Sequence, residues 1–218
     1  KSEYQKKFEN QKEETPEPKK WLETNLTAGS IDVNIMTKMD RENYENGEKL
    51  PEDYNDGRQA IRGFAESNLE SSVILSSGMN PKLYGYMENF KDFYPDENGY
   101  IKKKIVLKVS DYRSALIQGK FLAKKGLWVS EYRVESGLNC GGHAFATAGY
   151  LLGPILEEFK KSRAELKSST FEILKKGHEE KKFICPKTAP ELLISAQGGV
   201  GTTDEHKFLI DYFNVDSV

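Results

Sequence analysis

A glycine-rich segment, residues 197–203, has the composition of a phosphate-binding loop. It follows an apolar run typical of a buried strand and precedes a helical pattern with a suitable N-cap. Glycine lets the backbone approach a ligand closely, and the N–H groups at a helix N-terminus attract anions. A tight turn that binds nothing is the alternative interpretation. The cofactor-binding candidates are Gly198, Gly199, Gly201 and Thr202.

A second segment, residues 135–143, carries the best acid–base candidate. His143 follows Gly141 and Gly142, which are further cofactor-binding candidates, and a histidine side chain titrates near neutral pH. The segment comes after an expected strand that opens at Leu127, which is where barrel enzymes place catalytic groups. A structural histidine that is hydrogen-bonded within a glycine loop is the alternative.

Cys140 lies three residues before His143, and this spacing permits three interpretations. The cysteine is a nucleophile activated by the histidine, a metal ligand, or an inert buried residue. Structural zinc normally uses two close pairs, and nothing in the sequence brings Cys185 and His178 to this pair, so we predict no metal. His178 and His206 are predicted to be plain surface residues.

Lys108 interrupts the apolar run at residues 105–109. A lysine that points into the mouth of a barrel can face a phosphate or the electron-rich ring of a flavin. The alternative is that its charged end reaches solvent between helices. Lys108 is therefore a further cofactor-binding candidate.

Short apolar runs alternate with helical patterns, which predicts an α/β fold with parallel strands and covering helices. Because no Gly-x-Gly-x-x-Gly motif is present, a TIM-type β/α barrel is favoured over a dinucleotide-binding sheet. A complete barrel has eight strands, so we expect a partial barrel, truncated at both ends and completed by the remainder of a parent chain. Six strands are expected, at residues 31–36, 73–75 and 105–109, from an opening at residues 127–129, at residues 192–194, and from a beginning at residues 215–218.

The helical patterns have recognisable ends. Asp111 is a suitable N-cap for a helix that stops before Gly126, and Thr202 with Glu205 has the spacing of a capping box. Residues 151–176 predict one long helix or two shorter ones.

Three parts of the chain differ in composition. Residues 1–24 predict a charged N-terminal linker or helix, and residues 25–218 predict the barrel domain. Within that domain, residues 40–58 predict a long charged loop or insertion.

The overall composition excludes several classes of partner. The 32 lysines and arginines nearly balance the 34 acidic residues, and a net charge of −2 gives no reason to expect nucleic acid. No apolar run approaches the roughly 18 residues of a membrane span. Two cysteines imply no disulfide framework, which favours a reducing, cytoplasmic environment.

Residues 104–135 and the Gly-Gly-His motif at His143 resemble the strand–helix–strand–Gly-Gly-His passage of nitronate monooxygenases, which are FMN-dependent barrels. Residues 193–201 resemble the glycine-rich phosphate loop that follows in that family. The resemblance covers roughly residues 100–218, and the whole sequence also resembles longer bacterial proteins.

This resemblance implies that His143 removes the α-proton of the substrate and that FMN accepts the electrons and is reoxidised by O₂. It also implies an FMN phosphate held by glycines at positions that match Gly142, Gly198, Gly199 and Gly201. Asn139 and Cys140 stand where the family usually has Glu-Ala, and residues 144–190 include a longer insertion than expected.

The sequence therefore predicts an FMN-dependent oxidoreductase that acts on a small-molecule substrate. Two alternatives remain open. One is a barrel that binds a phosphorylated metabolite without redox chemistry, and the other is a catalytically silent structural domain.

Overall fold

The computed structural model describes residues 16–25, 31–35, 40–135, 152–198 and 200–218. The chain divides into two compact units, Lys1–Ile31 and Asp32–Val218. The first unit contributes helix α2 (Pro16–Asn25). All of the elements that follow belong to the second unit.

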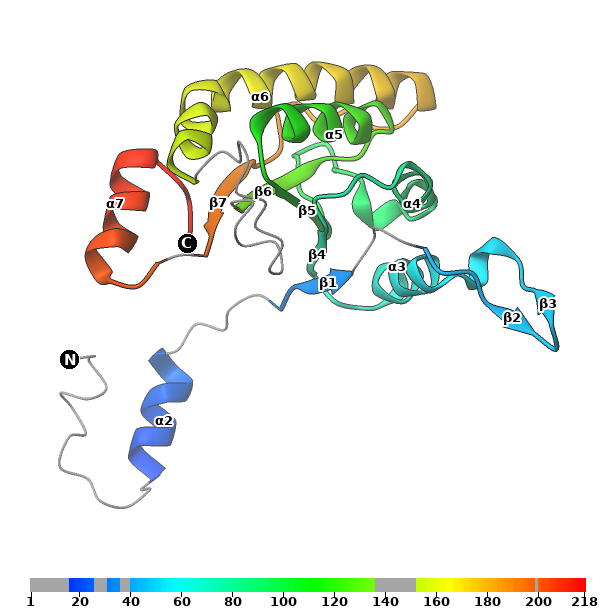
Figure 1. Cartoon of the computed structure of the whole chain (residues 1–218), viewed down its shortest axis with the longest axis horizontal. Helices are drawn as coiled ribbons and strands as arrows, with labels where there is room; N and C mark the ends of the chain where they lie inside the picture. The colour runs from blue at the N-terminus through cyan, green and yellow to red at the C-terminus, as the bar shows by residue number, and fades with distance from the viewer. Residues whose placement is uncertain (1–15, 26–30, 36–39, 136–151, 199) are drawn as a thin grey trace, which may run out of the picture. The chain divides into compact units, whose positions relative to one another are not determined.

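The second unit is organised around a five-stranded parallel sheet in the order β1-β4-β5-β6-β7 (Figure 1). The strand order therefore follows the chain order. The predicted sixth strand is present as a single parallel bridge from Ser217 to Ser195 beside β7. The strands are β1 (Val33–Ile35), β4 (Ser71–Leu75), β5 (Lys103–Val109), β6 (Val129–Glu135) and β7 (Leu193–Gln197).

Helices connect successive strands, which confirms the predicted α/β class with a parallel sheet and covering helices. In Figure 1, α5 and α6 lie together over one side of the sheet. The α-helices of this unit are α3 (Asp56–Glu66), α4 (Pro81–Tyr86), α5 (Tyr112–Lys124), α6 (Leu152–Lys181) and α7 (Thr203–Phe213). Short 3₁₀ turns lie at η1 (Glu52–Tyr54), η2 (Met87–Asn89) and η3 (Lys91–Phe93).

Local sequence signals explain where these helices begin and end. Asp111 caps α5 by accepting a 2.7 Å hydrogen bond from the Ser114 amide, as predicted. The helix is followed by Gly126 at φ 79°, a conformation that favours glycine. Residues 152–181 form one helix, α6. Their one proline, Pro154, falls in the first turn, where it breaks no helical hydrogen bond.

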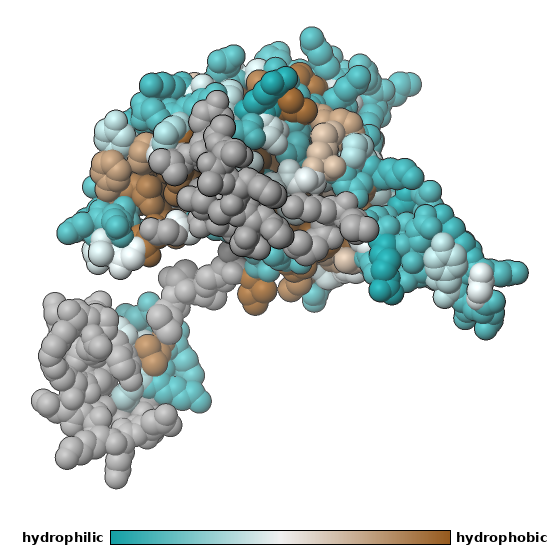
Figure 2. All heavy atoms as spheres, in the orientation of Figure 1, coloured by the Kyte–Doolittle hydropathy of each residue, from teal (hydrophilic) through white to brown (hydrophobic). Residues whose placement is uncertain are grey.

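The predicted loop at residues 40–58 has its own structure. A small antiparallel hairpin joins β2 (Tyr44–Glu45) to β3 (Glu48–Lys49), and α3 already starts at Asp56. Its two-residue turn is Asn46-Gly47, with φ of 51° and 84°, as a tight hairpin of this kind requires. The hairpin surface is hydrophilic (Figure 2).

His178 corrects a prediction, because it is fully buried rather than on the surface. Its Nδ1 lies 2.7 Å from the Ile184 carbonyl oxygen, and its Nε2 lies 2.9 Å from the Gly126 carbonyl oxygen. No local pattern predicts this burial, because the carbonyl partners come from the end of α5 and from the segment after α6. His206 is exposed on α7, as predicted.

Lys103 is the most unusual core residue, because a fully buried lysine opens β5. Its Nζ donates a 2.7 Å hydrogen bond to Ser67 Oγ and lies 4.6 Å from the centre of the Phe64 ring. Loss of water around the ammonium, with the nearby charge of Lys102, lowers the pKa of Lys103 below 10.5.

A pH-dependent stability follows from this lowered pKa. Between the folded-state pKa and 10.5, the unfolded chain binds more protons than the folded chain, so stability rises with pH. We expect the unfolding free energy of the wild type to increase relative to Lys103→Met as pH rises from the folded-state pKa toward 10.5. Urea denaturation at several pH values checks this, with Lys104→Met as the control for loss of a lysine from the same strand. A difference that stays constant or changes the other way contradicts the account.

Candidate functional site

The two faces of the sheet differ in chemistry because successive strand residues point to opposite sides. In β5, Ile105, Leu107 and Val109 belong to the hydrophobic core that the helices cover. In β6 the core residues are Val129, Tyr132 and Val134, and a register shift in the pairing with β5 separates Val129 from the alternation that starts at Glu131. Most alternate positions carry polar side chains, with the buried Val106 of β5 as an apolar exception, and we call this side the polar face. Its charged and hydrogen-bonding residues are Asp32, Lys104, Lys108, Glu131, Arg133, Glu135, Ser195 and Gln197.

Strand register places part of the polar face in one row. Lys108 pairs with Arg133, Arg133 pairs with Ser195, and Ser195 pairs with Ser217. Because the strands are parallel, these residues lie toward the same, carboxyl edge of the sheet. Open α/β sheets and α/β barrels bind their ligands at this edge.

Arg133 is the centre of the first charged cluster. Its Nε donates a 2.9 Å hydrogen bond to Glu131 Oε1, which also accepts a hydrogen bond from Ser195 Oγ. Its Nη2 lies 3.5 Å from Asp32 Oδ2. Burial alone would lower the pKa of Arg133, but the two carboxylates raise it, so the guanidinium stays charged.

Lys108 belongs to a second cluster at the ends of β5, β6 and β7. Its Nζ lies 4.0 Å from Oε2 of Glu135, whose side chain is almost completely buried. The same carboxylate oxygen accepts a 3.1 Å hydrogen bond from Gln197 Nε2. The ammonium of Lys108 is therefore held at the carboxyl edge instead of reaching solvent between helices.

A hollow of about 460 Å³ opens beside these clusters. A cavity of this size accommodates a small-molecule ligand. Polar and apolar atoms both line it, and the lining includes the first glycine of the predicted phosphate loop. The hollow is lined by Glu131, Arg133, Ser195, Ala196, Gln197, Gly198, Ser217 and Val218.

The start of α7 carries the predicted capping box. Thr202 Oγ1 accepts a 3.2 Å hydrogen bond from the Glu205 amide, and Glu205 Oε2 accepts hydrogen bonds from the amides of Gly201 and Thr202 at 2.8 and 2.9 Å. These hydrogen bonds lower the pKa of Glu205, first of all the bond from the Gly201 amide. The helix terminus thus holds an anionic group already, supplied by its own side chain.

The predicted site residues fall into two groups. His143, Gly141, Gly142 and Gly199 lie outside the described residues, as does Cys140. Lys108, Gly198, Gly201 and Thr202 all lie at the carboxyl edge, on β5 or in the segment from β7 to α7.

Among the described residues, Gly198 and Arg133 line the same hollow, whereas Gly201 and Thr202 lie at the helix terminus beyond it. Gly198 has a φ of 90°, so the turn after β7 requires glycine there. Within the described ranges, no three His, Cys, Asp or Glu side chains are grouped so that they could hold a metal ion.

Sequence reasoning missed the residues that form the charged clusters. The signal was present in β6, where Glu131, Arg133 and Glu135 alternate with apolar residues. A parallel strand covered by apolar layers on both sides is hydrophobic at every position, so alternating charges indicate a polar face. The partners before β1 and on β7 had no comparable signal, because strand pairing decides which residues meet.

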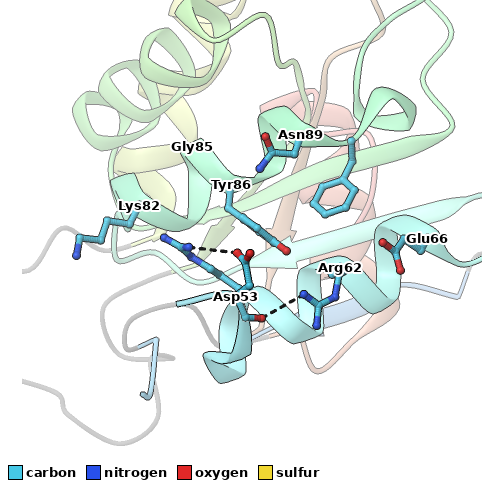
Figure 3. Close-up of a pocket in the computed structure, with 9 residues that line it drawn as sticks. Asp53, Arg62, Glu66, Lys82, Gly85, Tyr86 and Asn89 are labelled. Atoms are coloured by element: carbon cyan, nitrogen blue, oxygen red, sulfur yellow. Dashed lines mark hydrogen bonds and ion pairs between the residues drawn. The ribbon is translucent and has the colours of Figure 1, made fainter. Parts of the chain in front are cut away.

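A second hollow, of about 550 Å³, lies between α3 and α4 (Figure 3). Arg62 reaches toward Asp53 and donates a 3.2 Å hydrogen bond to its carbonyl oxygen, while Lys82 points away from this pair (Figure 3). Arg58 is already paired with Glu52 and Asp53. Because Arg58 is ion-paired, Arg62 is bonded to a backbone carbonyl and Lys82 points outward, we do not assign this hollow as the functional site.

The second unit is therefore a parallel α/β domain whose sheet has a polar face and a hollow at its carboxyl edge. Comparisons with protein-family models, curated proteins and solved structures found no match for this chain. In the part of the chain that the structure describes, no helix is long and apolar enough to cross a bilayer.

Proposed function

We propose that this chain is part of an FMN-binding β/α barrel and that it belongs to an FMN-dependent oxidoreductase of the nitronate monooxygenase type. The strand order supports the barrel, because β1, β4, β5, β6 and β7 are neighbours in chain order. A doubly wound sheet reverses its direction of growth after the first strands, whereas a barrel adds each new strand on the same side.

The contact between Arg133 and Asp32 supports a strongly curved sheet. β1 and β6 are separated by β4 and β5, so in a flat sheet their backbones would be about 14 Å apart. The two charged groups are nevertheless only 3.5 Å apart. Side chains from strands so far apart meet most easily across the concave side of a curled sheet, which is the interior of a barrel.

The described residues offer groups suited to FMN. The hollow at Gly198 is large enough for a flavin, and Lys108 provides a positive charge at the carboxyl edge. Bound FMN would supply the electron acceptor for oxidation of the substrate. Glu135 and Gln197 would position Lys108, and His143 would take the substrate proton.

The observation that carries this proposal is the polar, charged face at the carboxyl edge of the parallel sheet. Oxygen consumption with an alkyl nitronate in the presence of FMN tests it. We expect turnover by the wild type and none by His143→Ala, with unchanged FMN affinity in the variant. Turnover that survives in His143→Ala removes this residue from the mechanism, and absence of turnover in the wild type contradicts the proposed activity.

Glu205 competes with a phosphate for the amides of Gly201 and Thr202. Glu205→Gln removes the negative charge and keeps an oxygen that can cap the helix, so we expect FMN to bind about two- to fivefold more tightly. Titration of flavin fluorescence measures the change, and Asp204→Asn in the same helical turn is the matched control. Equal or weaker FMN binding by Glu205→Gln would mean that the phosphate does not use this helix terminus.

A further inference from the structure

We infer that a further hollow, at the amino edge of the sheet, binds a small aromatic anion such as an aryl carboxylate or sulfonate. The hollow has a volume of about 560 Å³, which suits a small molecule. One of its lining residues, His178, contacts the carbonyl oxygen of Gly126 just before β6 begins, so it lies at the opposite edge from the glycine loop. This inference does not depend on the proposed FMN binding.

Aromatic and branched side chains form the apolar part of the wall. Phe183 is 45% exposed and Ile184 is 69% exposed, both just after the end of α6. The rings of Tyr94 and Phe183 meet edge to face, with their centroids 4.9 Å apart. All three residues line the hollow. An apolar surface in a concavity favours a ligand whose own apolar group removes it from water.

Hydrogen bonds hold this wall in place. The Ile184 carbonyl oxygen lies 2.7 Å from His178 Nδ1, and the Phe183 amide donates a 2.9 Å hydrogen bond to the His178 carbonyl oxygen. On the other side, Tyr94 Oη donates a 2.9 Å hydrogen bond to the Glu88 carbonyl oxygen. The hollow is therefore formed before a ligand arrives, which reduces the entropy lost on binding.

Both carboxylates at the hollow already have partners in the protein. Glu88 forms ion pairs with Lys125 and Lys181. Asp96 Oδ1 accepts hydrogen bonds from two backbone amides, at 2.8 and 2.9 Å. A cationic ligand would have to compete with these partners for either carboxylate.

Two lysines supply positive charge that is not compensated in the same way. Lys91 and Lys182 line the hollow, and neither has an ion pair within 4 Å among the described residues. With the two lysines that pair with Glu88, the lining residues and their ion-pair partners carry four lysines against two carboxylates. This excess of positive charge attracts an anion, and the aromatic wall favours an anion that carries a ring.

8-Anilinonaphthalene-1-sulfonate tests the inference, because it joins an aromatic system to one negative charge. We expect saturable binding to the folded protein, measured by fluorescence titration. N-phenyl-1-naphthylamine has the same hydrocarbon skeleton without the charge. The double variant Lys91→Gln, Lys182→Asn should weaken sulfonate binding about three- to tenfold and leave the affinity for the neutral compound unchanged. Asparagine tolerates the left-handed backbone at position 182, where φ is 59°.

Ile184→Ser tests the apolar wall. It should weaken binding of both compounds about three- to tenfold, because it removes an apolar contact from the hollow. Ile117→Ser is the matched control, since Ile117 is 51% exposed on α5 and does not line the hollow, and it should leave both affinities unchanged. The inference is wrong if the sulfonate does not bind, if Ile184→Ser weakens binding no more than Ile117→Ser, or if the double variant affects both compounds equally.

Discussion

Arg133→Met is expected to lower the unfolding free energy by about 2–4 kcal/mol, because it leaves two poorly solvated carboxylates without a counter-charge. Glu131 and Asp32 both rely on this guanidinium, and their side chains are only 14% and 22% exposed. Removing one partner of a buried ion pair lowers stability by more than the intact pair adds to it, because the remaining charge stays buried without a counter-charge.

Urea denaturation of Arg133→Met and of Lys104→Met provides the comparison. Both variants remove a positive charge from the polar face, but Lys104 has no ion pair within 4 Å among the described residues. Adding Glu131→Leu and Asp32→Asn to Arg133→Met should recover much of the lost stability. If Arg133→Met loses no more stability than Lys104→Met, the charged cluster does not hold the strands together.

Gly177→Ala is expected to destabilise the protein by about 2 kcal/mol, although alanine is the better helix former. A β-carbon at Gly177 would lie 2.8 Å from the Lys124 carbonyl oxygen and 2.9 Å from that of Ala123. These are backbone atoms at the end of α5, so they cannot rotate away, and the helices must move apart. Overpacking of this kind destabilises a protein by up to about 3 kcal/mol. The higher helix propensity of alanine offsets about 1 kcal/mol of this, which leaves a net loss of about 2 kcal/mol.

Gly153→Ala in the same helix is the matched control. The nearest atom to a β-carbon there is Phe213 Cζ at 3.8 Å, an ordinary contact. We therefore expect Gly153→Ala to be neutral or to stabilise the protein by up to about 1 kcal/mol. Thermal denaturation of both variants separates the two effects, and equal changes at the two positions would refute a close contact between α5 and α6 at Gly177.

Local patterns were sufficient to predict the elements of the sheet and two helix ends. The strands at residues 73–75, 105–109 and 192–194 could be predicted because each is a short apolar run between turn residues. Asp111 and Thr202 could be predicted because capping depends on a few adjacent residues. Both signals are local, so one sequence contains them in full.

The candidate site was harder to predict from the sequence because its contacts join residues that are far apart in the chain. Lys108 could be singled out as a charge in an apolar strand, but its partner Glu135 could be identified only from the pairing of β5 with β6. The role of Asp32 could not be predicted at all, because its contact with Arg133 requires the sheet to curve across four strands. Glu205 was predicted as a capping residue, but its occupation of the Gly201 amide depends on the conformation of the loop.

Titration of the 218-residue chain with FMN, followed by flavin absorbance and fluorescence, tests the central claim most directly. The account predicts saturable binding at a single site in the micromolar range, weakened in Lys108→Met because the positive charge at the carboxyl edge is lost. Absence of any spectral change at FMN concentrations well above that range would contradict the claim that the polar face is a flavin site.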